Sequence, residues 1–251
     1  AKRPQYIWGV LQEAALGKVL GLPRVSVAEF GVAGGAGLVA MERAAEPTEE
    51  MIGIGIDVYG FDAGVGMPKS TDYRDRPYWL LAGAYPWDRN ELSKRLRGAQ
   101  LKLGFVKDTV QSFLQTSPAP VAFTAFDLVY YSSTKDALTL SDAKQERLLP
   151  RIPCFFRTSI GRTANDFSGE RFAISEFNSV HSHRKTSPMY GLRWYVAYRE
   201  MWALWPDMFF SLHAFDHPLY NEPHQLRMST IIDVEGSESF HAPRQWTGLQ
   251  Q

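Results

Sequence analysis

The sequence predicts one α/β domain with a doubly wound, mostly parallel sheet and helices on both of its faces. Strand-like and helical segments alternate from residue 25 to residue 149, and a glycine-rich turn follows the first strand. The chain has 251 residues and no clear linker, so we treat 1–251 as a single domain. A chain of this size buries about three quarters of its unfolded surface, which is enough for a core without disulfides.

Hydrophobic periodicity, interrupted by glycine and proline, gives the individual elements. We distinguish an N-terminal helical part (1–22), an insertion (62–98) that begins as a loop, and an aromatic-rich C-terminal part (185–251). The predicted strands are 25–30, 52–61, 100–106, 121–128 and 208–215, and the predicted helices are 5–20, 38–46, 89–98, 108–114, 133–149 and 192–205.

Composition excludes several classes of function. The 27 Lys and Arg residues balance 27 Asp and Glu residues, which argues against a nucleic-acid or anionic-lipid partner. No run approaches the 18 apolar residues of a membrane span, so we expect no membrane partner. The single cysteine, Cys154, suits a reducing cytoplasm and, beside Phe155, reads as an inert buried thiol.

The turn at Glu29–Gly37 carries the chemistry, because glycines between a strand and a helix let a ligand approach free backbone N–H groups. Three interpretations compete. A structural turn without a ligand is one, and a dinucleotide fingerprint (Gly35–Ala40, with Asp57 as the ribose acid) is the second. The third is E-x-G-x-x-x-G, the first motif of class I S-adenosylmethionine (SAM) methyltransferases, with Asp62 as the ribose acid.

Three later segments separate these interpretations: DVYGFDAGVGMP (57–68), LKLGFVKDTVQSFL (101–114) and AFTAFDLVYYSSTKDALT (122–139). In this order, after the glycine turn, the chain resembles the macrocin O-methyltransferase-like family of SAM-dependent methyltransferases over residues 25 to about 180. The resemblance implies a Rossmann-like sheet with SAM as cofactor and Asp127 at the active site. The cofactor-binding residues that it implies are Glu29, Gly31, Ala33, Gly34, Gly35, Asp62 (ribose), and Lys107, Asp108 and Thr109 (adenine).

The chain departs from the family where metal-dependent members carry further acids. Val129 stands two residues after Asp127, and Phe156-Arg157 stands in place of an Asp-Asp pair. A hard dication needs carboxylates, so we expect no metal site, and either metal-independent or lost catalysis. An arginine within ion-pair distance would also keep Asp127 ionised and lower its pKa.

Other residue patterns have less specific interpretations. His213 and His217 have zinc-pair spacing, but a loop His217 that serves as general base is the better hypothesis. Ser133, with Asp136 three residues on, reads as a helix cap. The polar stretch around His181 and His183 reads as a loop. An aromatic stripe fits a core or a homodimer interface and comprises Trp194, Tyr195, Tyr198, Trp202 and Trp205.

These observations lead to a SAM-dependent methyltransferase acting on a hydroxyl of a small natural product, either a sugar or an aromatic. Asp127 or His217 is the candidate general base. The alternatives are an inactive methyltransferase-like domain that binds a ligand or partner, and an NAD-linked oxidoreductase.

Overall fold

The computed structural model describes residues 3–79, 81–197, 200 and 202–222. Within these residues, one seven-stranded sheet has the order β3-β2-β1-β4-β5-β7-β6. β7 is antiparallel to both of its neighbours, and the other adjacent strands pair in parallel. The strands are β1 (Arg24–Phe30), β2 (Gly55–Asp62), β3 (Gln100–Leu103), β4 (Val121–Phe126), β5 (Arg151–Phe156), β6 (Arg184–Pro188) and β7 (Phe209–Ala214).

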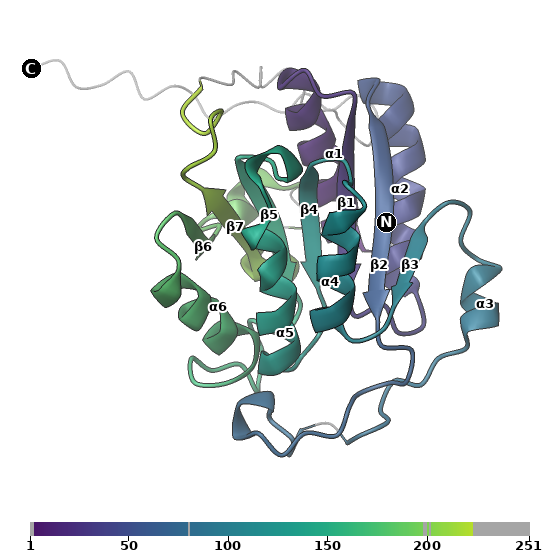
Figure 1. The fold of residues 1–251 in the computed structure, drawn as a ribbon, viewed down its shortest axis with the longest axis vertical. Helices are drawn as coiled ribbons and strands as arrows, with labels where there is room; N and C mark the ends of the chain where they lie inside the picture. The colour runs from purple at the N-terminus through teal and green to yellow at the C-terminus, as the bar shows by residue number, and fades with distance from the viewer. Residues whose placement is uncertain (1–2, 80, 198–199, 201, 223–251) are drawn as a thin grey trace, which may run out of the picture.

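Helices cover both faces of this sheet (Figure 1). One face packs against α1 (Pro4–Val19) and α2 (Ala36–Ile52), and the other packs against α4 (Val106–Gln115), α5 (Tyr131–Leu138) and α6 (Gly169–Val180). The short α3 (Arg89–Ser93) lies beyond β3. The predicted doubly wound, mostly parallel sheet with helices on both faces is therefore confirmed.

Four phenylalanines lie side by side in register at the carboxyl ends of β2, β1, β4 and β5. Neighbouring rings stack across the sheet, with centroids 4.7 Å apart for Phe61 and Phe30, 5.2 Å for Phe30 and Phe126, and 4.4 Å for Phe126 and Phe156. All four side chains are buried, and stacked aromatic pairs add stability beyond their buried area. The residues that follow each phenylalanine therefore emerge together at the carboxyl edge of the sheet.

The segment 63–99 between β2 and β3 runs along this carboxyl edge (Figure 1). Its 3-10 turn η1 (Tyr73–Asp75) contacts α5 and α6. Its helix α3 is capped by Asp88, whose carboxylate accepts the N–H groups of Asn90 and Glu91. Among the described residues, none of the helices is both long and apolar enough to span a membrane.

Two predicted helices are wrong. In place of one helix over 133–149, α5 ends at Leu138 and two 3-10 turns follow, because Leu149 donates its N–H to Val121 O (2.9 Å) and turns the chain into β5. Where the structure describes the aromatic segment 192–205, it forms a 3-10 turn at Leu192–Tyr195 that ends at an extended Val196, and Trp205 begins a second 3-10 turn.

The aromatic stripe consequently does not form one face of a helix. Trp194, Tyr195 and Trp202 are exposed, whereas Trp205 is buried against Trp8 and Phe209. Tyr198 lies outside the described residues.

β6, in the stretch interpreted as a loop, is an unpredicted strand. Its charged Arg184 and Lys185 hide the apolar alternation by which strands are recognised.

Candidate active site at the carboxyl edge

The site begins where the strand order reverses, between β1 and β4, which is where open α/β sheets bind ligands. Gly31, directly after β1, has φ +87° and donates its N–H to Phe61 O (2.8 Å). A Cβ on Gly31 would lie 2.4 Å from Asp127 O. Glycine is therefore required here by both the backbone conformation and the close approach of the loop after β4.

The rest of the turn leaves the start of α2 accessible. Ala33 (φ +44°) and Gly35 (φ +78°) turn the chain. Gly35 is the N-cap residue of α2 and has no side chain with which to cap the helix. A Cβ on Gly34 would meet nothing within 4 Å. An open glycine beside uncapped N–H groups can accept the negatively charged end of a ligand.

Asp62, the last residue of β2, holds this turn from the side. Its Oδ2 accepts the backbone N–H groups of Val32 and Ala33, both at 2.9 Å. Its Oδ1 accepts Gly64 N–H (2.7 Å) and the indole N–H of Trp87 (3.0 Å). A carboxylate has about four acceptor positions, so Asp62 is saturated in this structure.

The second half of the segment 63–99 closes over the turn. Leu92 packs where a Cβ of Gly35 would lie, at 2.1 Å, and Arg95 Nη1 donates to Gly34 O (2.7 Å). With Trp87, these residues form a cover that the sequence interpretation missed. The spacing of Asp88 and Glu91 predicts the start of a helix. It does not indicate that this helix packs against the glycine turn.

Glu29 lies beneath the turn and is buried. Its Oε1 accepts a hydrogen bond from the hydroxyl of Tyr6 (2.6 Å), whereas Oε2 is buried without a hydrogen-bond partner. Burial raises the pKa of Glu29 to about 8. Gly37 of α2 lies directly above, where a Cβ would collide with Oε1. Glu29 thus supports the first turn of α2 from within the core.

Asp127 follows β4 and donates its N–H to Phe30 O (2.8 Å). Burial raises its pKa, and the positive charges of Arg157 and Arg3 offset this only in part. Arg157 therefore lowers the pKa of Asp127 as expected, but desolvation is the larger effect and the net shift is upward. Within the described part of the chain, no three or more His, Cys, Asp or Glu side chains converge into a metal-binding group.

A buried guanidinium, Arg76, ties the insertion to the ends of β4 and β5. Its Nη2 donates to Val129 O (2.7 Å) and to Thr158 Oγ1 (3.3 Å), and its Nη1 donates to Thr163 O (3.1 Å). Nearby Glu170 accepts Thr158 N–H (2.7 Å), and burial raises its pKa to about 8. Nothing in the local sequence marked these two residues.

Asp75 caps α5 in place of the predicted Ser133. Its Oδ1 accepts Ser132 N–H (2.8 Å), and its Oδ2 accepts the hydroxyls of Ser132 (2.9 Å) and Ser70 (2.7 Å). The helix begins two residues before Ser133, so that side chain cannot serve as the cap.

The remaining predicted site residues divide between the two ends of the sheet. Lys107, Asp108 and Thr109 form the first turn of α4, and Gly104 just before it donates to Asp62 O (3.0 Å), so they border the site. Asp57 lies within β2, where it pairs with Arg24 (2.6 Å).

His217 follows β7, whose end pairs with the start of β5 at Arg151, so it lies at the edge opposite Asp127. The structure does not bring these two candidate bases together. Cys154 is buried and free, and burial raises its pKa to about 12, which confirms an inert thiol.

No protein-family model and no curated protein sequence matches the chain. Its fold, however, is shared with a solved methyltransferase structure. The crystal structure of CalS11, a calicheamicin methyltransferase, is similar over 75% of this chain and 77% of its own, with 23% identity and a TM-score of 0.52. The structure of the O-methyltransferase NovP is similar over 59% of this chain and 63% of its own, with 19% identity and a TM-score of 0.45. The first likeness agrees with the fold that the sequence resemblance implies.

Proposed function

We propose that the protein is a SAM-dependent methyltransferase that methylates a hydroxyl of a small sugar or aromatic natural product. The observation that carries this proposal is the glycine turn at the switch point, with an open Gly34, an uncapped α2 and the acid Asp62 beside it. The fold shared with a methyltransferase supports it.

The residues present fit such a cofactor. The turn Gly31–Gly35 would receive its amino acid end, with Glu29 supporting the turn from below. Asp62 would bind the ribose through Oδ1, once the N–H groups of Trp87 or Gly64 give way. The first turn of α4 would border the adenine.

When bound, SAM supplies a methyl group on a positively charged sulfur, which keeps the bonding electrons as the methyl leaves. The protein's main contribution would be to hold the acceptor oxygen in line with that carbon. Asp127 would take the acceptor's hydroxyl proton onto its carboxylate. Its raised pKa brings it closer to the working pH, which makes it a better base than an ordinary Asp.

We propose that this reaction needs no divalent metal. The positive charges of Arg157 and Arg3 act on Asp127, and guanidinium groups stay protonated and repel a dication. Activity that EDTA removes and Mg²⁺ restores would contradict this. An inactive binding domain is the second candidate, favoured by the missing acids at Val129 and Phe156. It predicts binding of S-adenosylhomocysteine without methylation of any acceptor.

Calorimetric titration with S-adenosylhomocysteine and with NAD tests the cofactor. We expect binding of the first and none of the second, and tight NAD binding alone would overturn the proposal. Asp62→Ala should weaken S-adenosylhomocysteine binding at least about tenfold, because hydrogen bonds to a charged group are worth about 1.5–3 kcal/mol each. Asp57→Ala is the matched control and should change the affinity much less.

A further inference from the structure

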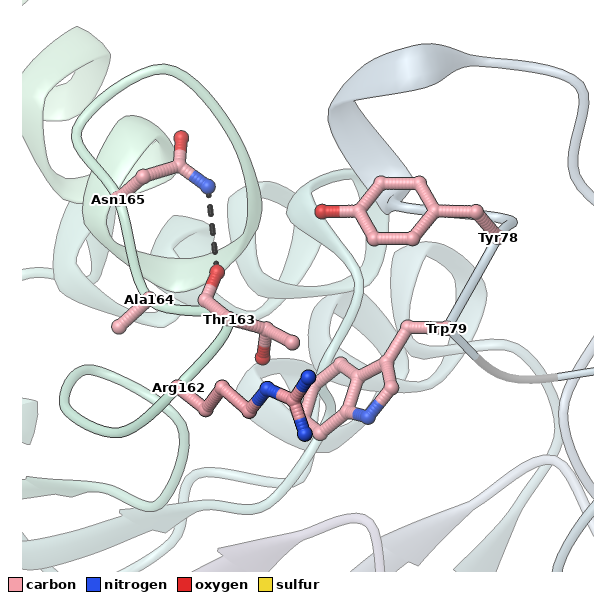
Figure 2. A pocket seen from close by; sticks show the side chains of 6 residues that line it. All are labelled: Tyr78, Trp79, Arg162, Thr163, Ala164 and Asn165. Atoms are coloured by element: carbon pink, nitrogen blue, oxygen red, sulfur yellow. Dashed lines mark hydrogen bonds between the residues drawn. The ribbon is translucent and has the colours of Figure 1, made fainter.

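A hollow of about 470 Å³ lies between the insertion and the β5–α6 connection. Figure 2 shows its two walls: Tyr78 and Trp79 on one side, and Arg162, Thr163 and Asn165 on the other. The hollow is open to solvent and lies outside the glycine turn. None of its lining residues belongs to the proposed cofactor site.

Arg76 fixes this hollow to the end of β4. The same guanidinium bonds Val129 O, two residues beyond Asp127, and Thr163 O, which lines the hollow. Asn165 Nδ2 also donates to Thr163 O (3.2 Å). The wall that carries Arg162 is therefore held in a defined place at the edge where methyl transfer is proposed.

The opposite wall offers aromatic rings. The Arg76 guanidinium lies 4.9 Å from the centroid of the Trp79 ring and holds it by a cation–π contact. The indole remains 39% exposed, and the ring of Tyr78 beside it is 75% exposed. Exposed aromatic rings suit packing against the ring of a sugar or an aromatic compound.

The hollow also carries one sign of charge. Among the described residues that line it, Arg162 alone is charged, and none is an acid. In the described part of the chain, the Arg162 guanidinium has no ion pair, and the nearby Asp166 is paired with Arg171. Figure 2 shows the Arg162 guanidinium and the indole of Trp79 among the side chains that line the hollow. Arginine is suited to bidentate recognition of phosphate and carboxylate groups.

We propose that this hollow binds a ring of the methyl acceptor that bears an anionic group, with Arg162 as the anion-binding residue and Trp79 as the ring platform. The proposal rests on the proposed function, because it treats the hollow as the acceptor side of that site. The anionic group of this ligand is a phosphate ester or a carboxylate next to a ring. The probes described below distinguish these two groups.

Ligand-observed NMR titration of the full chain with phenyl phosphate, benzoate and the neutral isostere benzamide tests the proposal. We expect at least one anionic probe to bind more tightly than benzamide. Arg162→Gln should weaken that probe at least tenfold and leave benzamide unchanged, and Trp79→Leu should weaken all the probes that bind. Arg43→Gln, an exposed arginine of α2, is the control and should change none. Binding of phenyl phosphate alone identifies a phosphate ester, and binding of benzoate alone identifies a carboxylate.

Equal binding of benzamide and both anions would overturn the proposal, as would an Arg162→Gln variant with unchanged affinities. The same variant should bind S-adenosylhomocysteine as the unmodified protein does. If the unmodified protein does not bind S-adenosylhomocysteine, the cofactor proposal is contradicted. The probe titrations would still decide whether the hollow binds an anionic ring compound.

Discussion

The two sides of the carboxyl edge are built in different ways. Around the ends of β1 and β2, backbone N–H groups, glycines and one carboxylate make the site, and Asp62 binds the turn that follows the adjacent strand. Around the ends of β4 and β5, a long buried side chain holds the loops together. Arg76 bonds Val129, Thr158 and Thr163, which lie 53, 82 and 87 positions further along the sequence. The first side depends on backbone conformation, and the second depends on one buried, hydrogen-bonded guanidinium.

Removing that charge should give the largest effect on stability. Arg76→Met removes three hydrogen bonds of a buried guanidinium and leaves the Val129 carbonyl without this donor. Hydrogen bonds to a charged group are worth about 1.5–3 kcal/mol each, and urea unfolding measures this loss. Arg171→Met is the control, because an exposed pair such as Arg171–Asp166 is worth about 0–1 kcal/mol. Equal losses in the two variants would show that Arg76 is not a special anchor.

Alanine substitutions at two glycines of the turn should distinguish the effect of backbone strain on stability from the effect of a Cβ on ligand binding. Gly31→Ala places a Cβ at positive φ against Asp127 O, and such strain costs about 1–3 kcal/mol of stability. Gly34→Ala has open space, so we expect little change in Tm but weaker S-adenosylhomocysteine binding. Thermal unfolding and calorimetry on both variants test this. A Gly34→Ala protein with unchanged affinity would mean that no ligand approaches there.

The buried acids should make stability fall as pH rises. Glu170 has a pKa of about 8 in the folded protein against an ordinary 4.5, so between these values the unfolded chain loses a proton that the folded chain keeps. Each such group lowers the free energy of unfolding by up to about 1.4 kcal/mol per pH unit in this window. Glu170→Gln should reduce the slope measured by urea unfolding from pH 5 to pH 8.

Glu29, with its pKa also raised to about 8, contributes a slope of the same sign. Glu29→Gln is therefore the matched variant, and the two changes together should flatten the profile more than either alone. A slope unchanged in both variants would show that these carboxyl groups are ionised in the folded protein.

The smallest effect concerns the cover over the turn. If ribose hydroxyls bind Asp62 Oδ1, Trp87→Phe removes a competing donor and should tighten S-adenosylhomocysteine binding two- to tenfold, or about 0.5–1.5 kcal/mol. Trp79→Phe, in the hollow, should leave this affinity unchanged. Weaker binding in Trp87→Phe would instead indicate that the indole contacts the ligand.

The sequence allowed prediction of the first side far better than the second. The turn, β1, β2 and Asp62 are signalled locally, because glycine spacing and strand patterns report backbone conformation within a few residues. The role of Arg76 depends on partners that only the complete fold brings together, and its segment reads as an ordinary polar loop. The same reason explains the end of α5 at Leu138, which a pairing with Val121 enforces against helical propensity.

One continuous segment, residues 63–99, carries both Arg76 and Trp87. Replacing the whole segment would therefore change the hollow and would also remove the donor that occupies Asp62. Exchanging only residues 69–79, which bear Trp79 and its anchor Arg76, would leave the contact with Asp62 in place. A junction between Gly83 and Trp87 thus allows the proposed acceptor site and the proposed cofactor site to be engineered separately.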